Sequence, residues 1–109
     1  MGVQFARTLA ARGANLVLVA RDEKKLDALA TELRASHGVT VDVIPADLSS
    51  ADALRKLSAA LTTRIPQIDL LVNDAGFGSA GTLAETDADV LSSELAVNVV
   101  AVAELMRAV

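Results

Sequence analysis

The sequence predicts an α/β fold in which helices cover a parallel β-sheet. Short apolar runs, typical of strands buried on both faces, alternate along the chain with longer amphipathic stretches typical of helices. Parallel neighbours need a long, right-handed connection, and the amphipathic stretches are long enough to provide it. The chain has 109 residues, the size of one domain. We therefore expect a single α/β domain over residues 1–109, with helices on both faces of the sheet.

A helix and a strand are expected first. Phe5 and Leu9, with neighbouring alanines, form an apolar stripe at helical spacing from Val3 to Arg12. Gly13 then follows the last turn, where a glycine commonly ends a helix. The unbroken apolar run 16–20 is typical of a buried parallel strand.

The second expected helix has signals at both ends. Asp22 precedes it as an N-cap, and His37 and Gly38 end it. Its inward face should carry the apolar positions Leu26, Leu29, Ala30 and Leu33. His37 is the single histidine of the chain and suits the negative end of a helix, which argues against a metal site.

The β-branched run 39–44, closed by Pro45, predicts a second strand. Ser49 or Ser50 should then begin a helix that Pro66 ends. The inward positions of this helix are expected to be Leu54, Leu57, Leu61 and Ile65.

The apolar run 68–73 predicts a third strand. A loop rich in glycine follows it, at Gly76, Gly78 and Gly81. Thr86 and Asp89 are spaced like a capping box with Asp in place of Glu, which predicts a final helix from about Asp87 to the end.

Composition excludes several classes of function. Ten Lys and Arg against fourteen Asp and Glu give a net charge of −4, so the chain lacks the positive field by which proteins bind nucleic acid or anionic membranes. The absence of Cys excludes disulfides, thiol nucleophiles and cysteine-ligated zinc. No apolar stretch has the length of a membrane span or the form of a signal peptide, so we expect a cytoplasmic protein.

Four segments resemble, in the same order and at matching separations, the motifs of one family. Residues 16–22 resemble a strand followed by cofactor-selecting residues, and Ala46-Asp47-Leu48-Ser49 resembles an adenine-contacting turn. Asn73-Asp74-Ala75-Gly76 resembles an Asn-Asn-Ala-Gly signature, and Asn98-Val99 resembles part of a Leu/Val-Asn-Val segment in the following helix. From Arg12 to Val100 the chain is thus similar to the short-chain dehydrogenase/reductase family.

The resemblance implies a partial doubly wound, Rossmann-like parallel sheet whose first strand and C-terminal half are missing. In that strand order the missing strand lies between the strands expected at 16–20 and 68–73. We therefore expect two apolar strand edges that are unpaired or forced together. Either the chain is marginally stable by itself, or it is a stretch of a longer enzyme.

Arg21 stands nineteen residues after Gly2, directly after a strand, where Rossmann-type folds place the residue that meets the ribose 2′ position. A cation there favours NADP(H) over NAD(H), and its place beside the positive end of the next helix favours a bound anion. An exposed arginine with no ligand is the alternative. The resemblance implies that Gly2 is the last glycine of a phosphate-binding loop.

The resemblance implies further cofactor contacts after the next two strands. Asp47 would accept a hydrogen bond from the adenine amino group, with Leu48 in the same turn; a simple helix cap is the alternative for Asp47. The loop under the adenine ribose would comprise Asn73, Ala75 and Gly76. Gly76 would allow close backbone approach, whereas Asp74, in place of the usual second Asn, would introduce a buried carboxylate.

Asn98 interrupts the apolar stretch 95–102 of the last expected helix, where an unpaired polar side chain is costly. The resemblance implies a catalytic role, in which this Asn bends the helix and holds a water that connects to a catalytic lysine. A buried Asn bonded to neighbouring backbone is the alternative.

The implied activity is hydride transfer between a nicotinamide and a small carbonyl or alcohol substrate, by a Tyr, a Lys four residues later, and a Ser. The sequence contains no Tyr, so we expect this chain alone to be inactive. A non-catalytic nucleotide-sensing or partner-binding module is the alternative. The apolar end of the last helix, at Val102, Leu105 and Met106, leaves a homo-oligomer possible.

Overall fold

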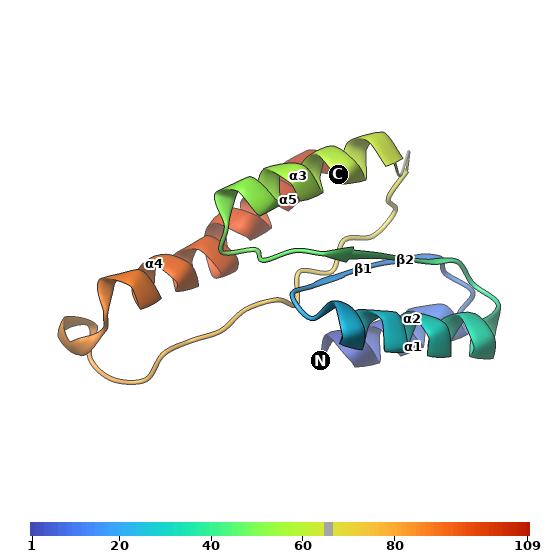
Figure 1. The fold of residues 1–109 in the computed structure, drawn as a ribbon, viewed down its shortest axis with the longest axis horizontal. Helices are drawn as coiled ribbons and strands as arrows, with labels where there is room; N and C mark the ends of the chain where they lie inside the picture. Colours follow the sequence, from blue (N-terminus) through green and yellow to red (C-terminus); the bar gives the residue numbers. More distant parts are fainter. Residues whose placement is uncertain (65–66) are drawn as a thin grey trace. The chain divides into compact units, whose positions relative to one another are not determined.

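The computed structural model describes residues 1–64 and 67–109, which form two compact units. The first unit, Met1–Ala46, contains the elements α1 (Gly2–Ala11), β1 (Leu16–Ala20), α2 (Glu23–His37) and β2 (Val41–Pro45) (Figure 1). The second unit, Asp47–Val109, contains the elements α3 (Ala51–Arg64), the 3-10 helix η1 (Leu83–Glu85), α4 (Ala88–Leu95), the π-helix η2 (Ala96–Val100) and α5 (Ala101–Ala108).

The two strands of the first unit pair in parallel, as the sequence predicts. Leu16 lies opposite Val41, and the register continues to Ala20 opposite Pro45. The backbone N–H of Ala46 donates to the carbonyl of Ala20 at 2.9 Å, which extends the pairing one residue past β2. The carboxyl ends of β1 and β2 therefore lie at the same edge of the sheet.

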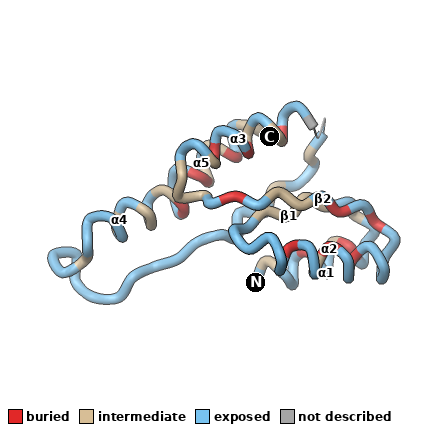
Figure 2. Tube along the Cα trace, viewed as in Figure 1, coloured by how far each residue is buried: buried red, intermediate tan, exposed pale blue. Residues whose placement is uncertain are grey.

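The core of the first unit lies where α1 and α2 pack against each other and against the strands. Its buried positions, red in Figure 2, are Ala6, Ala10, Ala30, Leu33, Val39 and Val41. Three of these six are helix alanines, whose small side chains let two helices approach closely. Phe5, expected on the inward stripe of α1, is instead 45% exposed, so the alanines of that helix and not its aromatic residue make the contact.

Both ends of α2 form as predicted. The Asp22 carboxylate accepts a hydrogen bond from the backbone N–H of Lys25 at 3.1 Å, which caps the N-terminus. At the other end Gly38 adopts the left-handed conformation, with φ of 65°, and its N–H donates to the carbonyl of Arg34. The helix thus begins and ends where side-chain and glycine signals place it.

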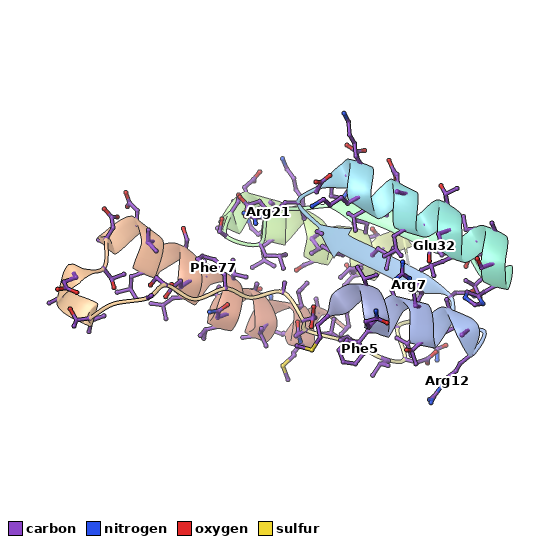
Figure 3. The ribbon with its side chains drawn as sticks, turned by 90° about the horizontal axis from the view of Figure 1, so that it is seen from below. Phe5, Arg7, Arg12, Arg21, Glu32 and Phe77 are labelled. Carbon is purple, nitrogen blue, oxygen red and sulfur yellow. The ribbon has the colours of Figure 1, made fainter. Side chains whose placement is uncertain are left out.

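An ion pair joins α1 to α2. The Arg7 guanidinium donates to both carboxylate oxygens of Glu32, at 2.9 and 3.2 Å, and Figure 3 shows the two side chains pointing toward each other. This hydrogen bond from Arg7 lowers the pKa of the Glu32 carboxyl below its ordinary value. The pair is about half exposed, so its contribution to stability is small.

In the second unit, α3 and α5 contact each other through their apolar faces. The buried positions are Leu54, Leu57, Leu61, Val97, Ala101 and Leu105. The Ser50 hydroxyl accepts a hydrogen bond from the backbone N–H of Ala53 at 3.3 Å. Of the two serines predicted to begin α3, Ser50 is therefore the one that bonds to the first turn of the helix. The expected positions of Ile65 and Pro66 lie outside the described residues.

The prediction of a third strand at 68–73 is wrong. Residues 67–73 form neither strand nor helix, and Leu70 is 62% exposed. A strand needs a neighbour to bond its backbone N–H and C=O groups. The described residues of the second unit contain no strand, so this apolar run has none to pair with there.

The last helix begins where predicted, but it is capped differently. Asp87 is its N-cap and accepts from the backbone N–H of Asp89, whereas the capping box lies earlier, between Thr82 and Glu85 at η1. The predicted box at Thr86 is therefore wrong. The helix is interrupted by the π-helical turn η2, in which the N–H of Ala101 donates to the carbonyl of Ala96.

Replacing Gly38 should destabilise the first unit. An added Cβ would meet no atom within 4 Å, so the cost of Gly38→Ala is conformational: an alanine at φ of 65° should lose about 1 kcal/mol of unfolding free energy. Urea denaturation followed by circular dichroism measures this. Gly78→Ala is the matched control, since its Cβ would also meet nothing and its φ is not positive. Equal effects of the two changes would contradict the left-handed cap.

The ion pair should make stability depend on acidity. Glu32 has a lowered pKa when folded, so its contribution is fully present above its unfolded value, near 4.5, and is lost as the pH falls through the folded value. Glu32→Gln should therefore lower the urea midpoint slightly at pH 7, and by less at pH 3, where part or all of this contribution is lost. Asp27→Asn, on the same helix and outside this pair, is the control. An equal loss at both pH values would count against the pairing.

Candidate functional site

A shallow pocket lies at the carboxyl end of β1. It is lined by Ala20, Arg21, Asp22 and Lys25, which come from the end of the strand and the first turn of α2. Arg21 is exposed and stands directly after the strand (Figure 3). The structure thus places Arg21 at the strand end where α/β sheets bind ligands, as predicted.

The charges around this pocket favour an anion. Arg21 and Lys25 contribute two cationic side chains, and the N-terminus of α2 adds its partial positive charge. The carboxylate of Asp22 is directed to the backbone N–H of Lys25. Lys25 was not predicted as a site residue; it lies in the first turn of α2, where its side chain lines the pocket.

Asp47 closes a turn after β2. Its Oδ1 accepts from the backbone N–H of Ser49 at 3.0 Å and from the Ser49 hydroxyl at 2.7 Å. Leu48 is half-buried within this turn. Helix α3 begins only at Ala51, so Asp47 orders the turn that leads into the helix, whereas Ser50 bonds to the helix itself.

The loop with the expected Asn-Asp-Ala-Gly motif lies on the surface of the second unit. Asn73, Asp74, Ala75 and Gly76 are all exposed and belong to no helix or strand. The expectation of a buried Asp74 carboxylate is therefore wrong. The strand expected at 68–73 does not form, so this loop does not follow the end of a strand.

Asn98 bonds to the end of this loop with both of its polar groups. Its Nδ2 donates to the carbonyl of Phe77 at 2.7 Å, and its Oδ1 accepts from the backbone N–H of Phe77 at 3.1 Å. A Cβ added to Gly76 would lie 3.0 Å from Oδ1 of Asn98. The close approach at position 76 in this structure is thus to the side-chain amide of Asn98.

The alternative of a buried Asn bonded to backbone is wrong about burial, since Asn98 is exposed, but its side chain does bond to backbone, at Phe77. The apolar stretch around it packs through Val97 and Ala101, on either side of Asn98 in the chain. Its partner Phe77 lies 21 residues earlier, in the loop. Phe77 was not predicted as a site residue, since nothing local in the sequence links it to position 98.

Gly2 is the first residue of α1 and is half-buried. It therefore stands at a helix N-terminus, the position at which backbone N–H groups bind phosphates in dinucleotide-binding folds. Among the described residues, no helix has both the length and the apolar content to cross a membrane, and no three His, Asp or Glu side chains gather as a metal site.

Comparison with known proteins gives close sequence relatives. An 11-beta-hydroxysteroid dehydrogenase of Sesamum indicum is 38% identical over 87 residues, which are 80% of this chain and 25% of that protein. A short chain dehydrogenase of Pseudocercospora fijiensis is 32% identical over 111 residues, covering all of this chain and 36% of that protein.

Solved structures agree with these relatives. An alcohol dehydrogenase of Comamonas testosteroni, specific for bulky-bulky ketones, superposes with a TM-score of 0.92 at 36% identity over 98% of this chain and 43% of the other. A short-chain dehydrogenase of Sphingobium yanoikuyae in complex with NADPH gives the same score and identity over 98% of this chain and 41% of the other. The Rossmann-like α/β class predicted from the sequence is confirmed.

The chain spans between 25% and 42% of the length of the first four curated relatives that it matches. The family model described as short chain dehydrogenase matches residues 1–109. Together with the relatives and the strand-end residues above, this match shows that the chain belongs to the short-chain dehydrogenase family.

Proposed function

We propose that this chain forms the cofactor-binding part of an oxidoreductase that uses NADP(H) in preference to NAD(H). The observation that carries the proposal is the pocket after β1, in which Arg21 and Lys25 stand together at the N-terminus of α2. Solved relatives from Sphingobium yanoikuyae and Gluconobacter frateurii are complexes with NADPH, and one from a metagenomic source is a complex with NADP.

The preference rests on charge. NADP(H) differs from NAD(H) by a 2′-phosphate, and two cations beside a helix N-terminus stabilise such a dianion. An acidic side chain is the usual partner of an unmodified ribose at this point of the fold. Here Asp22 is the one carboxylate that lines the pocket, and as the N-cap of α2 it accepts a hydrogen bond from the backbone N–H of Lys25. The residues present therefore fit a phosphate better than a ribose hydroxyl.

The other predicted cofactor contacts are kept as proposals for the residues of each unit by itself. Asp47 would accept a hydrogen bond from the adenine amino group, and its carboxylate is oriented by two hydrogen bonds from Ser49. Leu48 would pack beside the adenine ring. Gly2 would approach the pyrophosphate, and the adenine ribose would lie over Asn73, Ala75 and Gly76.

When bound, the nicotinamide cofactor supplies or accepts the hydride that reduces or oxidises a small carbonyl or alcohol substrate. The residues of this chain bind and orient the cofactor, and they hold the loop at 73–76 that would contact it. Proton transfer to the substrate needs a group such as tyrosine, which the chain does not contain. We therefore propose that these 109 residues do not catalyse the reaction alone.

We also propose that the last helix associates with a second copy of the chain. Leu95 of α4, Val99 of η2 and Met106 of α5 are each more than half exposed. Exposed apolar side chains of this kind are typical of a protein–protein contact.

Removing either cation should weaken NADPH binding selectively. Arg21→Ala and Lys25→Ala should each lower the affinity for NADPH about tenfold or more, because each removes one charge-assisted contact to the 2′-phosphate. The affinity for NADH, which lacks that phosphate, should change little. Isothermal titration with both cofactors, and with 2′,5′-ADP against 5′-AMP, measures the difference.

Lys24→Ala is the matched control for these variants, because Lys24 is a neighbouring exposed lysine that does not line the pocket. Its effect on NADPH binding should be small. Equal affinity of the unmodified chain for NADPH and NADH would contradict the proposed preference.

The chain alone should show no turnover. Mixed with NADPH and a panel of ketones, it should oxidise NADPH no faster than buffer does, since no tyrosine is available to protonate the substrate oxygen. The loss of NADPH is measured by the absorbance of its reduced nicotinamide ring. Turnover by the purified chain would refute this part of the proposal, whereas selective nucleotide binding without turnover is also what a nucleotide-sensing module would give.

A further inference from the structure

We propose that Arg34 and Pro45 close the outer edge of β2 to strand addition by a second copy of the chain. The outer edge is the side of β2 that faces away from β1. Among the described strands β1 is the only neighbour of β2, so this edge presents backbone groups that no described strand bonds. An apolar edge of this kind is a template for pairing between chains.

The register of the sheet identifies which residues of β2 face outward. Successive residues of a strand direct their backbone N–H and C=O groups to opposite sides. The N–H of Leu16 donates to the carbonyl of Thr40, and the N–H of Ala46 donates to the carbonyl of Ala20. The even-numbered residues from 40 to 46 therefore face β1. The outward-facing residues are Val41, Val43 and Pro45.

A side chain of α2 occupies the first outward-facing carbonyl. The Nη2 of Arg34 donates a hydrogen bond to the carbonyl oxygen of Val41, and this bond is partly buried. A strand added at this edge would need the same carbonyl as an acceptor for one of its own N–H groups. It would also have to displace or desolvate a guanidinium, which stays charged throughout the ordinary pH range. Arg34 thus takes the place that an added strand would need.

The C-terminal end of α2 brings Arg34 to the strand. The backbone carbonyl of Arg34 accepts from the N–H of Gly38, whose left-handed conformation ends the helix. Leu33 on the helix and Val41 on the strand are both buried, which fixes the two elements against each other. The same arginine therefore ends the helix through its backbone and covers the strand edge through its side chain.

Pro45 removes the last outward-facing donor. It is exposed and, like any proline, has no backbone N–H, a feature that confines proline within sheets to edges and strand ends. If two copies paired antiparallel about Val43, the Val41 carbonyl of one copy would meet Pro45 of the other and find no donor. Of the three outward-facing residues, Val43 is thus the one that neither feature affects.

The composition of β2 gives this closure its purpose. Five of the six residues from 39 to 44 are β-branched, and the sixth, Asp42, is the only charged one. High β-propensity with little charge is the composition of segments that pair with their own copies. The residues that make β2 a strand therefore also make its outer edge a risk, which a charged side chain and a proline reduce.

Removing both features should make the chain associate. Arg34→Ala uncovers the Val41 carbonyl and Pro45→Ala restores an N–H, so the double variant should associate at concentrations about tenfold lower than the unmodified chain does. Each single variant should lie between the two, since it keeps one feature. Sedimentation velocity across the micromolar to millimolar range measures this. An association curve of the double variant equal to that of the unmodified chain would overturn the proposal.

The Val43 amide hydrogen shows where the association occurs. In the double variant it should exchange with solvent about tenfold more slowly at high than at low protein concentration, because a second copy then bonds to it. In the unmodified chain its exchange should not depend on concentration. Association without protection at Val43 would overturn the proposal, since contact through the last helix leaves this amide open. The amide of the buried Leu33 reports that each variant stays folded.

A charge-matched variant separates the contact from net charge. Arg12→Ala removes a cation from an exposed position directly after α1, in the same unit. Combined with Pro45→Ala, it should associate no more than Pro45→Ala alone. Association equal to that of the Arg34→Ala and Pro45→Ala pair would refute the role of Arg34. No step of this test uses a cofactor, so a failure of NADPH binding would refute the proposed function and leave the closed edge standing.

Discussion

The parallel pairing of β1 with β2 is the interaction on which the first unit depends. It aligns Leu16 through Ala20 with Val41 through Pro45, so that both strands end at one edge. It also gives α1 and α2 a surface to pack against, and neither helix could bury its apolar face without that surface. The pocket around Arg21 exists because α2 begins directly where β1 stops.

Most of the first unit was predictable because its signals are local. The strand at 16–20 has no polar interruption, Asp22 and Gly38 mark the two ends of α2, and Gly13 follows α1. Each signal acts within one turn of helix or one strand. The exposure of Phe5 was not predictable, because a stripe of alternating alanine and larger residues does not say which of them faces the partner helix.

The second unit shows where local signals fail. Residues 68–73 have the composition of a buried strand, but strand formation depends on a neighbour that these residues cannot specify themselves. The partner of Asn98 was equally hidden, since Phe77 is distant in sequence and offers only its backbone. The sequence predicts that Asn98 needs a partner and that Gly76 allows close backbone approach. The structure joins these two statements into one contact.

The close fit between Gly76 and Asn98 also has an evolutionary consequence. A Cβ at position 76 would lie 3.0 Å from Oδ1 of Asn98, so a side chain there requires the amide to shift, and once the amide is lost the glycine is no longer constrained by it. Substitutions at the two positions should therefore accumulate together among descendants of this sequence, with the change at 98 preceding the change at 76.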